Sequence, residues 1–280
     1  MIKTFILLKS LDKKTIKALI RPRIASSHKG NHGHALIIAG SKGRMGACVI
    51  AARACLRSGA GLLTVNVPET EHLILQVTIP EAMVVMQGED TDLKSFSAAG
   101  IGPGIGTSKA SKKLLQQVLH HFHKPLLLDA DALTILSEQQ SVLKNLPKGT
   151  ILTPHPKEFD RLFGNHKNEK ERTKKAIDMS IKYGVIIVLK GHKTVITHNG
   201  DTVVNSTGNA GLAKGGSGDA LTGIITAFLA QGYQPFSAAK IGVYLHGLAA
   251  DLALQQQSME SMLITDVIEY FGAAFKKTMR

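Results

Sequence analysis

The sequence predicts an α/β fold in which helices cover both faces of a mainly parallel sheet. Its strand candidates are almost wholly apolar, as in residues 185–189 (VIIVL), so neither face of such a strand suits exposure to water. These strands alternate along the chain with segments that have apolar residues at helical spacing. Buried strands that alternate with helices are typical of parallel α/β sheets.

In the first half of the chain, strands are expected at residues 34–39, 62–67, 82–86, 98–101 and 125–128. The first strand leads through the glycine loop 40–46 into a helix over residues 47–58. That helix carries Cys48 and Cys55, which we expect to be buried apolar residues. A basic helix is expected over residues 108–123.

In the second half, a strand over residues 150–153 ends at Pro154, and a helix over 168–183 precedes the strand 185–189. Residues 194–197 and 202–204 are expected to form a hairpin through Asn199-Gly200, a pair that readily adopts positive φ. Helices near residues 217–231, 236–254 and 260–275 complete the chain.

The composition favours one domain over residues 1–280, with residues 1–25 as a basic N-terminal extension. Hydrophobic residues make up 44% of the 280, enough for a large core, and no linker, repeat or low-complexity tract interrupts them. The apolar start, residues 5–8, is too short for a signal peptide, and no run reaches the length of a membrane span. Two cysteines provide neither a disulfide framework nor a zinc spacing. We therefore expect a cytoplasmic protein with no membrane partner.

The formal charge of +13 raises the question of nucleic acid. Residues 1–30 alone hold eight Lys and Arg against one Asp, a net +7. However, the chain has no Trp and only 5% aromatic residues, so it offers few platforms for stacking bases. The charge therefore favours small anionic ligands such as nucleotides, and no nucleic-acid partner is expected.

The most informative segment is residues 209–221, NAGLAKGGSGDAL. Its glycines precede a helical run, and the amides of Gly216, Ser217 and Gly218 would lie at a helix N-terminus, where a phosphate is bound by free N–H groups and the helix dipole. Asp219 would repel a phosphate, but it suits a base that takes a proton from a hydroxyl during phosphoryl transfer. Alternatively, the segment is a glycine-rich turn with Asp219 as an ordinary first-turn carboxylate.

Two other glycine motifs are excluded by spacing. Gly211 and Gly216 have the separation of a P-loop, but Ser217 follows directly and the P-loop lysine is missing. Residues 100–106 place glycine at every second position, which is not the dinucleotide fingerprint.

Other candidate site residues follow strands, and the carboxyl ends of parallel strands share one edge of a sheet. His155 lies between Pro154 and Pro156, so it is either a rigid ligand contact or the cap of a turn, with Pro156 at the first helical position. Lys190 could hold the phosphates or ribose of a nucleotide, although the segment 190–194 also reads as a hairpin-edge turn. Asp129 and Asp131 could share a magnesium ion or orient a hydroxyl, and Asp131 could instead be the N-cap of a helix over residues 132–136.

Together these segments form a recognisable series: residues 27–30 (SHKG), 38–41 (IAGS), 59–61 (GAG), 102–104 (GPG), 128–133 (LDADAL), 152–158 (LTPHPKE), 189–191 (LKG) and 208–221. The chain resembles the ADP-dependent NAD(P)H-hydrate dehydratases of the ribokinase-like superfamily over roughly residues 20–275. The resemblance implies a three-layer α/β/α fold with a mainly parallel central sheet. It also implies a free-standing dehydratase without the epimerase domain to which the family is often fused.

The resemblance implies a repair reaction, in which hydrated NADH or NADPH (the S epimer) is dehydrated while ADP becomes AMP and phosphate. By analogy with kinases, the ring hydroxyl is phosphorylated and the ring nitrogen then expels phosphate. Asp219 is then the base, and the amides of residues 216–218 stabilise the moving phosphoryl group.

The remaining implied roles are assigned by position. Ala47, Gly104, His155 and Asp219 match positions that bind the hydrated dinucleotide. The family positions that bind the adenine nucleotide correspond to Lys190, Gly191, His192, Lys193, Thr194 and Gly218. Magnesium is expected, ADP is the co-substrate, and the resemblance suggests a homotetramer paired functionally with a separate epimerase.

The chain departs from its relatives at two points, and one alternative function stays open. Related kinases usually have Asn-x-x-Glu where this chain has residues 155–158 (HPKE), and the family commonly has glycine at Lys157. Glu158 is therefore only a possible metal ligand. The alternative is a small-molecule kinase of the same superfamily, acting on an alcohol such as a vitamin precursor, which would keep Asp219 and leave a phosphorylated product.

Overall fold

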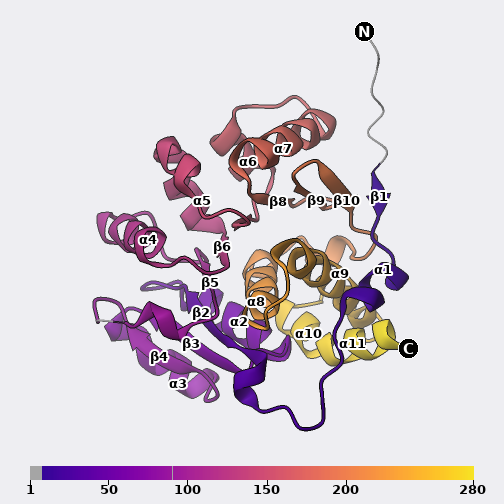
Figure 1. Ribbon diagram of the computed structural model, residues 1–280. Coiled ribbons are helices and arrows are strands. Elements are labelled where there is room, and N and C mark those ends of the chain that lie inside the picture. The colour runs from indigo at the N-terminus through magenta and orange to yellow at the C-terminus, as the bar shows by residue number, and fades with distance from the viewer. Residues whose placement is uncertain (1–7, 90) are drawn as a thin grey trace.

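The computed structural model describes residues 8–89 and 91–280 (Figure 1). Residues 1–7, which include most of the apolar start and part of the basic extension, lie outside the described residues. The strands are β1 (Lys9–Ser10), β2 (His34–Ile38), β3 (Leu62–Val67), β4 (Met83–Met86), β5 (Ala98–Ile101), β6 (Leu126–Leu128), β7 (Ile151–Leu152), β8 (Ile186–Leu189), β9 (Val195–His198) and β10 (Asp201–Val204).

The helices are α1 (Lys13–Leu19), α2 (Met45–Arg57), α3 (His72–Thr78), α4 (Lys109–His121), α5 (Ala130–Glu138), α6 (Pro156–Phe163), α7 (Glu169–Tyr183), α8 (Ser217–Ala230), α9 (Pro235–Ala253), α10 (Ile264–Glu269) and α11 (Phe271–Met279). Short 3₁₀ turns link several of them. None of the helices in residues 8–89 and 91–280 combines the length and the apolar character needed to cross a bilayer.

All ten strands form one sheet, in the order β1-β10-β9-β8-β7-β6-β5-β2-β3-β4. Every neighbouring pair is parallel except those that involve β9, which is antiparallel to β8 and β10. The predicted hairpin is confirmed, because Asn199 and Gly200 both have positive φ and pair His198 with Asp201. The mainly parallel α/β fold expected from the apolar strands is therefore present.

Two apolar cores separate the sheet from its helices, which makes three layers (Figure 1). One core includes residues of α2, α8, α9, α10 and α11, and the other includes residues of α4, α5, α6 and α7. Helices α2 and α8 pack closely because Gly223 has no side chain: an added Cβ there would lie 1.9 Å from the carbonyl oxygen of Ala51. Cys48 and Cys55 are buried in this layer, as expected.

Two local predictions were wrong. The expected helix over residues 260–275 is two helices, because the chain breaks at Tyr270, whose ψ of 0° is not helical, and each helix buries its own apolar residues. Helix α5 begins at Ala130 with Asp129 in the N-cap position, so Asp131 is not the cap. Its carboxylate instead accepts a hydrogen bond from the amide of Gly106 (2.8 Å).

Candidate functional site

Four helices begin near the carboxyl ends of the parallel strands. Strands β2, β5, β6, β7 and β8 run in the same direction, and α2, α5 and α6 begin in the loops that follow β2, β6 and β7. Helix α8 is the fourth, because Gly218 in its first turn lies close to Lys190, the residue that follows β8. Helices α2, α5 and α8 have no side-chain cap on their first turns. The free amides and the positive dipole ends suit an anion at this edge.

The start of α8 has the shape expected of a phosphate cradle. Gly216 is the N-cap residue in the left-handed conformation (φ 92°). Within residues 8–89 and 91–280, no acceptor receives a hydrogen bond from the amides of Gly218 and Asp219. An added Cβ at Gly218 would lie 3.2 Å from Nζ of Lys190, so the absence of a side chain leaves the space above that ammonium group open.

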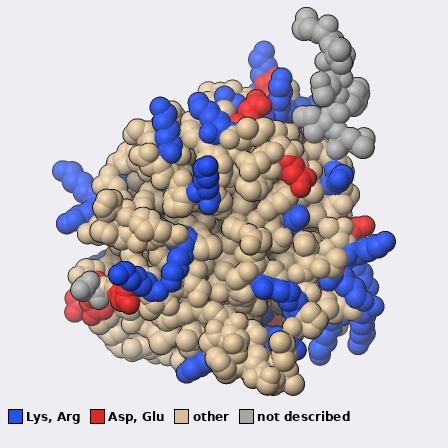
Figure 2. Space-filling model, viewed as in Figure 1, with Lys and Arg blue, Asp and Glu red and all other residues tan. Residues whose placement is uncertain are grey.

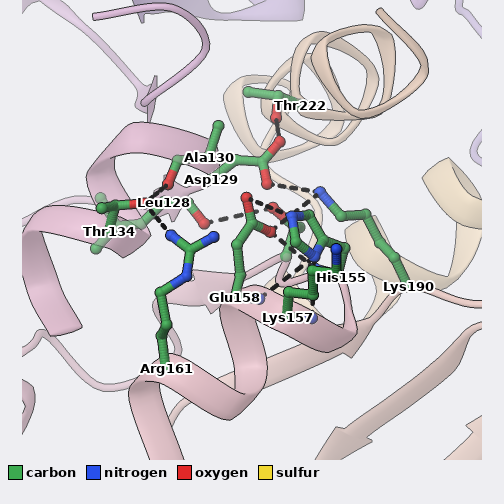
Figure 3. Close-up of polar contacts among 11 residues, drawn as sticks. Leu128, Asp129, Ala130, Thr134, His155, Lys157, Glu158, Arg161, Lys190 and Thr222 are labelled. Atoms are coloured by element: carbon green, nitrogen blue, oxygen red, sulfur yellow. Dashed lines mark hydrogen bonds and ion pairs between the residues drawn. The ribbon is translucent and has the colours of Figure 1, made fainter. Parts of the chain in front are cut away.

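Beneath the cradle lies a buried ion pair (Figure 3). Lys190 Nζ donates to Oδ1 of Asp129 (2.8 Å), and the hydroxyl of Thr222 donates to Oδ2 (2.8 Å). Asp129 is almost fully buried, at 1% exposure. Burial by itself would lower the pKa of Lys190, but the carboxylates of Asp129 and Glu158 raise it above its ordinary value. Lys190 therefore keeps its charge beneath the start of α8.

Asp219, in the first turn of α8, differs from the neighbouring carboxylates of Asp129, Asp131 and Glu158 in its surroundings. It is partly buried and accepts no hydrogen bond from the part of the chain that the structure describes. Burial is the main cause that raises its pKa to about 6, and the negative charges of Asp129 and Asp131 raise it further while Lys190 lowers it. A carboxylate with this pKa can accept a proton near neutral pH.

His155 caps helix α6, and the structure therefore bears out the capping interpretation of this residue. Its Nδ1 accepts hydrogen bonds from the amides of Lys157 (3.1 Å) and Glu158 (3.3 Å), while Oε2 of Glu158 accepts from the His155 amide (2.8 Å). Burial lowers the pKa of His155, so the ring is neutral with its proton on Nε2. That nitrogen lies 3.4 Å from Oε1 of Glu158.

A cavity of about 610 Å³ opens beside the start of α8. The predicted site residues that line it are His155, Lys190, Gly191, His192, Thr194, Ser217 and Gly218. Lys193 lies on the other side of the same loop, where it lines a second cavity with Lys170 and Lys174 of α7. The cavity therefore brings together most of the residues predicted for the adenine nucleotide, except Lys193.

Ala47 and Gly104 form a separate group at the ends of β2 and β5. An added Cβ at Gly104 would lie 3.3 Å from Cβ of Ala47, and Ser41 donates a hydrogen bond to the carbonyl of Gly104 (2.7 Å). Neither residue lines the cavity beside α8. Burial is the main cause that raises the pKa of Cys48, which follows Ala47, and the charge of Asp219 raises it further, so Asp219 lies near this group.

Asp129 and Asp131 have different partners. Asp129 binds Lys190 and Thr222, whereas Asp131 accepts from the Gly106 amide and lies 3.6 Å from Arg44. Among the described residues, no group of three or more His, Cys, Asp or Glu side chains could hold a metal ion. The described residues therefore form no all-protein metal cage in this region.

Several cavity residues were not predicted from the sequence. Asn205, Thr207 and Asn209 lie on one wall, and Val243, His246 and Gly247 come from α9. Asp251 orders this wall by accepting from the Gly208 amide (2.9 Å) and from Nδ2 of Asn209 (3.0 Å). Two of the cavity residues had a sequence signal: Asn209 is the first residue of the segment 209–221, and His246 is a single histidine in the long apolar stretch of α9.

Sequence comparison matches residues 35–272 to the family described as NAD(P)H-hydrate dehydratase. A bifunctional NAD(P)H-hydrate repair enzyme Nnr of Moorella thermoacetica is 36% identical over 89% of this chain and 50% of its own length. This chain thus spans about half the length of such relatives. The ADP-dependent (S)-NAD(P)H-hydrate dehydratase of Neisseria meningitidis is 37% identical over 89% of this chain and 87% of its own.

The fold is matched by a solved structure of the ADP/ATP-dependent NAD(P)H-hydrate dehydratase of Bacillus subtilis, co-crystallised with ATP and Mg²⁺. The two superpose with a TM-score of 0.87 and 33% identity, over 98% of this chain and 100% of the other. The family match over most of the chain and the identity to full-length relatives lead to one conclusion: the chain belongs to the NAD(P)H-hydrate dehydratase family.

Proposed function

We propose that the protein dehydrates the S epimer of hydrated NADH or NADPH at the expense of ADP and so releases NAD(P)H, AMP and phosphate. The observation that carries the proposal is Asp219, a carboxylate that has no hydrogen-bond partner among the described residues and a pKa of about 6, in the first turn of a helix without a side-chain cap. The names of relatives at 35–37% identity support the same reaction.

In this proposal, Asp219 takes the proton of the hydroxyl on the hydrated nicotinamide ring. The oxygen then attacks the β-phosphate of ADP, the bond to the bridging oxygen breaks, and AMP leaves. The ring nitrogen expels the phosphate from the carbon, and loss of a proton from the neighbouring ring carbon restores the reduced nicotinamide. Asp219 suits the first step because its pKa lies close to neutral pH, which favours a general base.

The start of α8 would hold the transferred phosphoryl group. The amides of Gly216, Ser217 and Gly218 stand at the positive end of the helix, although that of Ser217 also donates to the carbonyl of Lys214 (3.4 Å). Lys190 adds a full charge beneath Gly218. Fixed donors of this kind stabilise the charge that develops on the phosphoryl oxygens. The adenosine part of ADP would lie in the cavity beside Lys190, Gly191, His192 and Thr194, with Lys193 on the outer side of the loop. The hydrated ring would approach Asp219 from Ala47, Gly104 and His155.

Magnesium would be bound together with the phosphates of ADP. Mg²⁺ is commonly held by one or two carboxylates plus substrate phosphates, so the lack of a three-ligand cluster among the described residues fits this mode of binding. Glu158, whose Oε2 lies 3.9 Å from Nζ of Lys190, is the candidate carboxylate. The ion would neutralise charge on the phosphates, while Glu158 keeps its capping bond to the amide of His155.

A small-molecule kinase could use the same base and cradle, so the two reactions must be separated by their products. We favour the dehydratase because the full-length relatives with 35–37% identity carry that name. The bifunctional relatives support the pairing of this activity with an epimerase. A homotetramer is part of the same proposal and rests on the family resemblance.

The experiment mixes purified protein, Mg²⁺ and hydrated NADH with ADP and, separately, with ATP. The proposal predicts that the near-ultraviolet absorbance of reduced nicotinamide returns, with AMP formed from ADP. A protein that binds ADP but restores no absorbance with either nucleotide would refute the dehydratase. A stable phosphorylated alcohol as product would favour the kinase.

A further inference from the structure

The second cavity, which is lined by α7 and by the ends of β8, β9 and β10, has a volume of about 560 Å³. Three aliphatic side chains form its base, because Val195 of β9 pairs with Leu189 of β8 on one side and with Val204 of β10 on the other. Partners in register lie on the same face of a sheet, so these side chains make one apolar strip. The strip suits an aliphatic group.

The strip is left uncovered because the start of α7 does not pack on the sheet. Of the 15 residues of α7, all of them described, only Ala176 and Ser180 are buried. The first turns of the helix instead border the cavity, which Lys170, Thr173 and Lys174 line from one side of the helix. The cavity is therefore a gap between the first turns of α7 and the aliphatic strip.

The lining of this gap carries an excess of positive charge. Lys170, Lys174 and Lys193 line the cavity and have exposed side chains. None of the three forms an ion pair with any residue in 8–89 or 91–280. Glu169 is the one acidic residue among the described residues that line the cavity. The lysines therefore attract an anion to the same cavity that has an apolar base.

The two other cations at this cavity are already paired within the protein. Arg172 donates from Nη2 to Oδ2 of Asp160 (2.7 Å) and from Nε to Oδ1 (3.0 Å). Nζ of Lys190 donates to Asp129 (2.8 Å). The three exposed lysines thus supply the positive charge that is not neutralised by a carboxylate in the described part of the chain.

We propose that this cavity binds a small amphipathic anion, namely an aliphatic chain that ends in a phosphate group. The chain would lie on the aliphatic strip, and the phosphate would lie among the three lysines. A lysine ammonium group binds phosphate as a point charge, and a phosphate with two charges interacts favourably with several such groups. Although Lys190 and Gly191 line both cavities, this site is on the other side of their loop from the cavity beside α8 and does not depend on the proposed function.

The test is titration calorimetry of the full chain with n-octyl phosphate, at concentrations below those that form micelles. We expect saturable binding of this probe and weaker binding of octanoate, octan-1-ol and inorganic phosphate, which lack the second charge, the charged head and the chain, respectively. Lys170→Ala combined with Lys174→Ala should raise the Kd of octyl phosphate about three- to thirtyfold, the effect of two exposed ion pairs. Thr173→Trp should abolish binding, because the indole fills the gap above the strip.

Lys175→Ala combined with Lys182→Ala is the matched control, because it removes the same charge from α7 at residues that do not line this cavity. It should bind octyl phosphate as the wild type does, and melting curves establish that each variant is folded. The proposal is overturned if octyl phosphate does not bind saturably, if the two double variants bind it equally well, or if a folded Thr173→Trp keeps the wild-type Kd. Octan-1-ol or inorganic phosphate that binds as tightly as octyl phosphate would overturn the amphipathic class, and equally tight octanoate would overturn the assignment to phosphate. Competitive displacement of octyl phosphate by ADP would locate the probe beside α8 and would also overturn the proposal.

Discussion

At the residue scale, Asp129 and Asp219, two of the carboxylates close to Lys190, have different environments. Asp129 is fully engaged by Lys190 and Thr222, whereas Asp219 has no hydrogen-bond partner in the described part of the chain. The field of Asp129 is one reason why the pKa of Asp219 is raised. One carboxylate therefore holds the cation in place, and the other can accept a proton.

The pH dependence of kcat/KM should report on Asp219. A base must be deprotonated to act, so activity should rise with pH through a midpoint near 6, the pKa of this carboxyl group. Lys190→Ala should move the midpoint to higher pH, because Lys190 lowers the pKa of Asp219, and it should also raise the KM for ADP. The profile is measured at saturating ADP for both proteins. A Lys190→Ala midpoint below that of the wild type would contradict this electrostatic picture.

Asp219 should also destabilise the folded protein at neutral pH. Its folded-state pKa is above the ordinary value, so the folded state loses stability as pH rises from about 4 through about 6. Asp219→Asn removes this titration and should stabilise the protein at pH 7 on the order of 1–2 kcal/mol, which is a few degrees in Tm. At pH 4 the two proteins should melt at similar temperatures. A variant less stable than the wild type at pH 7 would mean that the carboxylate has a structural partner.

His155 offers a test that separates helix capping from ligand binding. Asn is a good N-cap residue and Ala is a poor one, so His155→Asn should keep the wild-type Tm, whereas His155→Ala should cost about 1 kcal/mol. If His155 also contacts the hydrated dinucleotide, both variants should raise the KM for it. Equal Tm values for the Ala and Asn variants would contradict the capping role.

At the element scale, the start of α8 depends on two glycines for different reasons. Gly216 has a φ of 92°, and an added Cβ would lie 2.7 Å from Cδ1 of Ile50, so Gly216→Ala should lower stability by about 1–2 kcal/mol. Gly218 is helical, and its added Cβ would meet only the flexible end of Lys190 and the Asp129 carboxylate. Gly218→Ala should therefore keep the Tm but reduce turnover, because the methyl group blocks the phosphate. Melting curves and kcat values of the two variants test whether Gly216 serves stability and Gly218 serves turnover. Wild-type turnover of Gly218→Ala would contradict the role given to Gly218.

The elements themselves were largely predictable because their patterns are local. Apolar strands predicted the parallel sheet, and Pro156 with Glu158 predicted the start of α6. The alternative in which Asp131 caps α5 was wrong, and the bond that its carboxylate accepts instead comes from the amide of Gly106, 25 residues away. The break at Tyr270 was missed because both helices share one apolar pattern in the sequence.

At the scale of the whole molecule, the chain has a formal charge of +13. On the face seen in Figure 2, the positive side chains are dispersed and do not form a single patch. Lysine and arginine side chains are dispersed around this face, with a group at its right edge, and acidic side chains lie between some of them. A dispersed positive charge is consistent with attraction of small polyanions such as ADP and NADPH. It does not add support for a nucleic-acid partner.

The site could be predicted only in part, because its central contacts join distant segments. The glycine segment before α8 and the place of Asp219 in the first turn of that helix were apparent from local sequence. The bond between Thr222 and Asp129 spans 93 residues, and that between Lys190 and Asp129 spans 61, so both depend on the assembled sheet. His246 was missed for the same reason, since α9 forms part of the cavity wall only in the folded chain.

The most direct test follows NADH and AMP in one reaction of hydrated NADH with ADP and Mg²⁺, for the wild type and for Asp219→Asn. The wild type should form AMP and NADH in equal amounts. The variant should bind ADP nearly as well but turn over about a hundredfold more slowly, or not detectably, because it lacks the base. A variant that keeps half of the wild-type rate, or wild-type NADH recovery without AMP, would contradict the account.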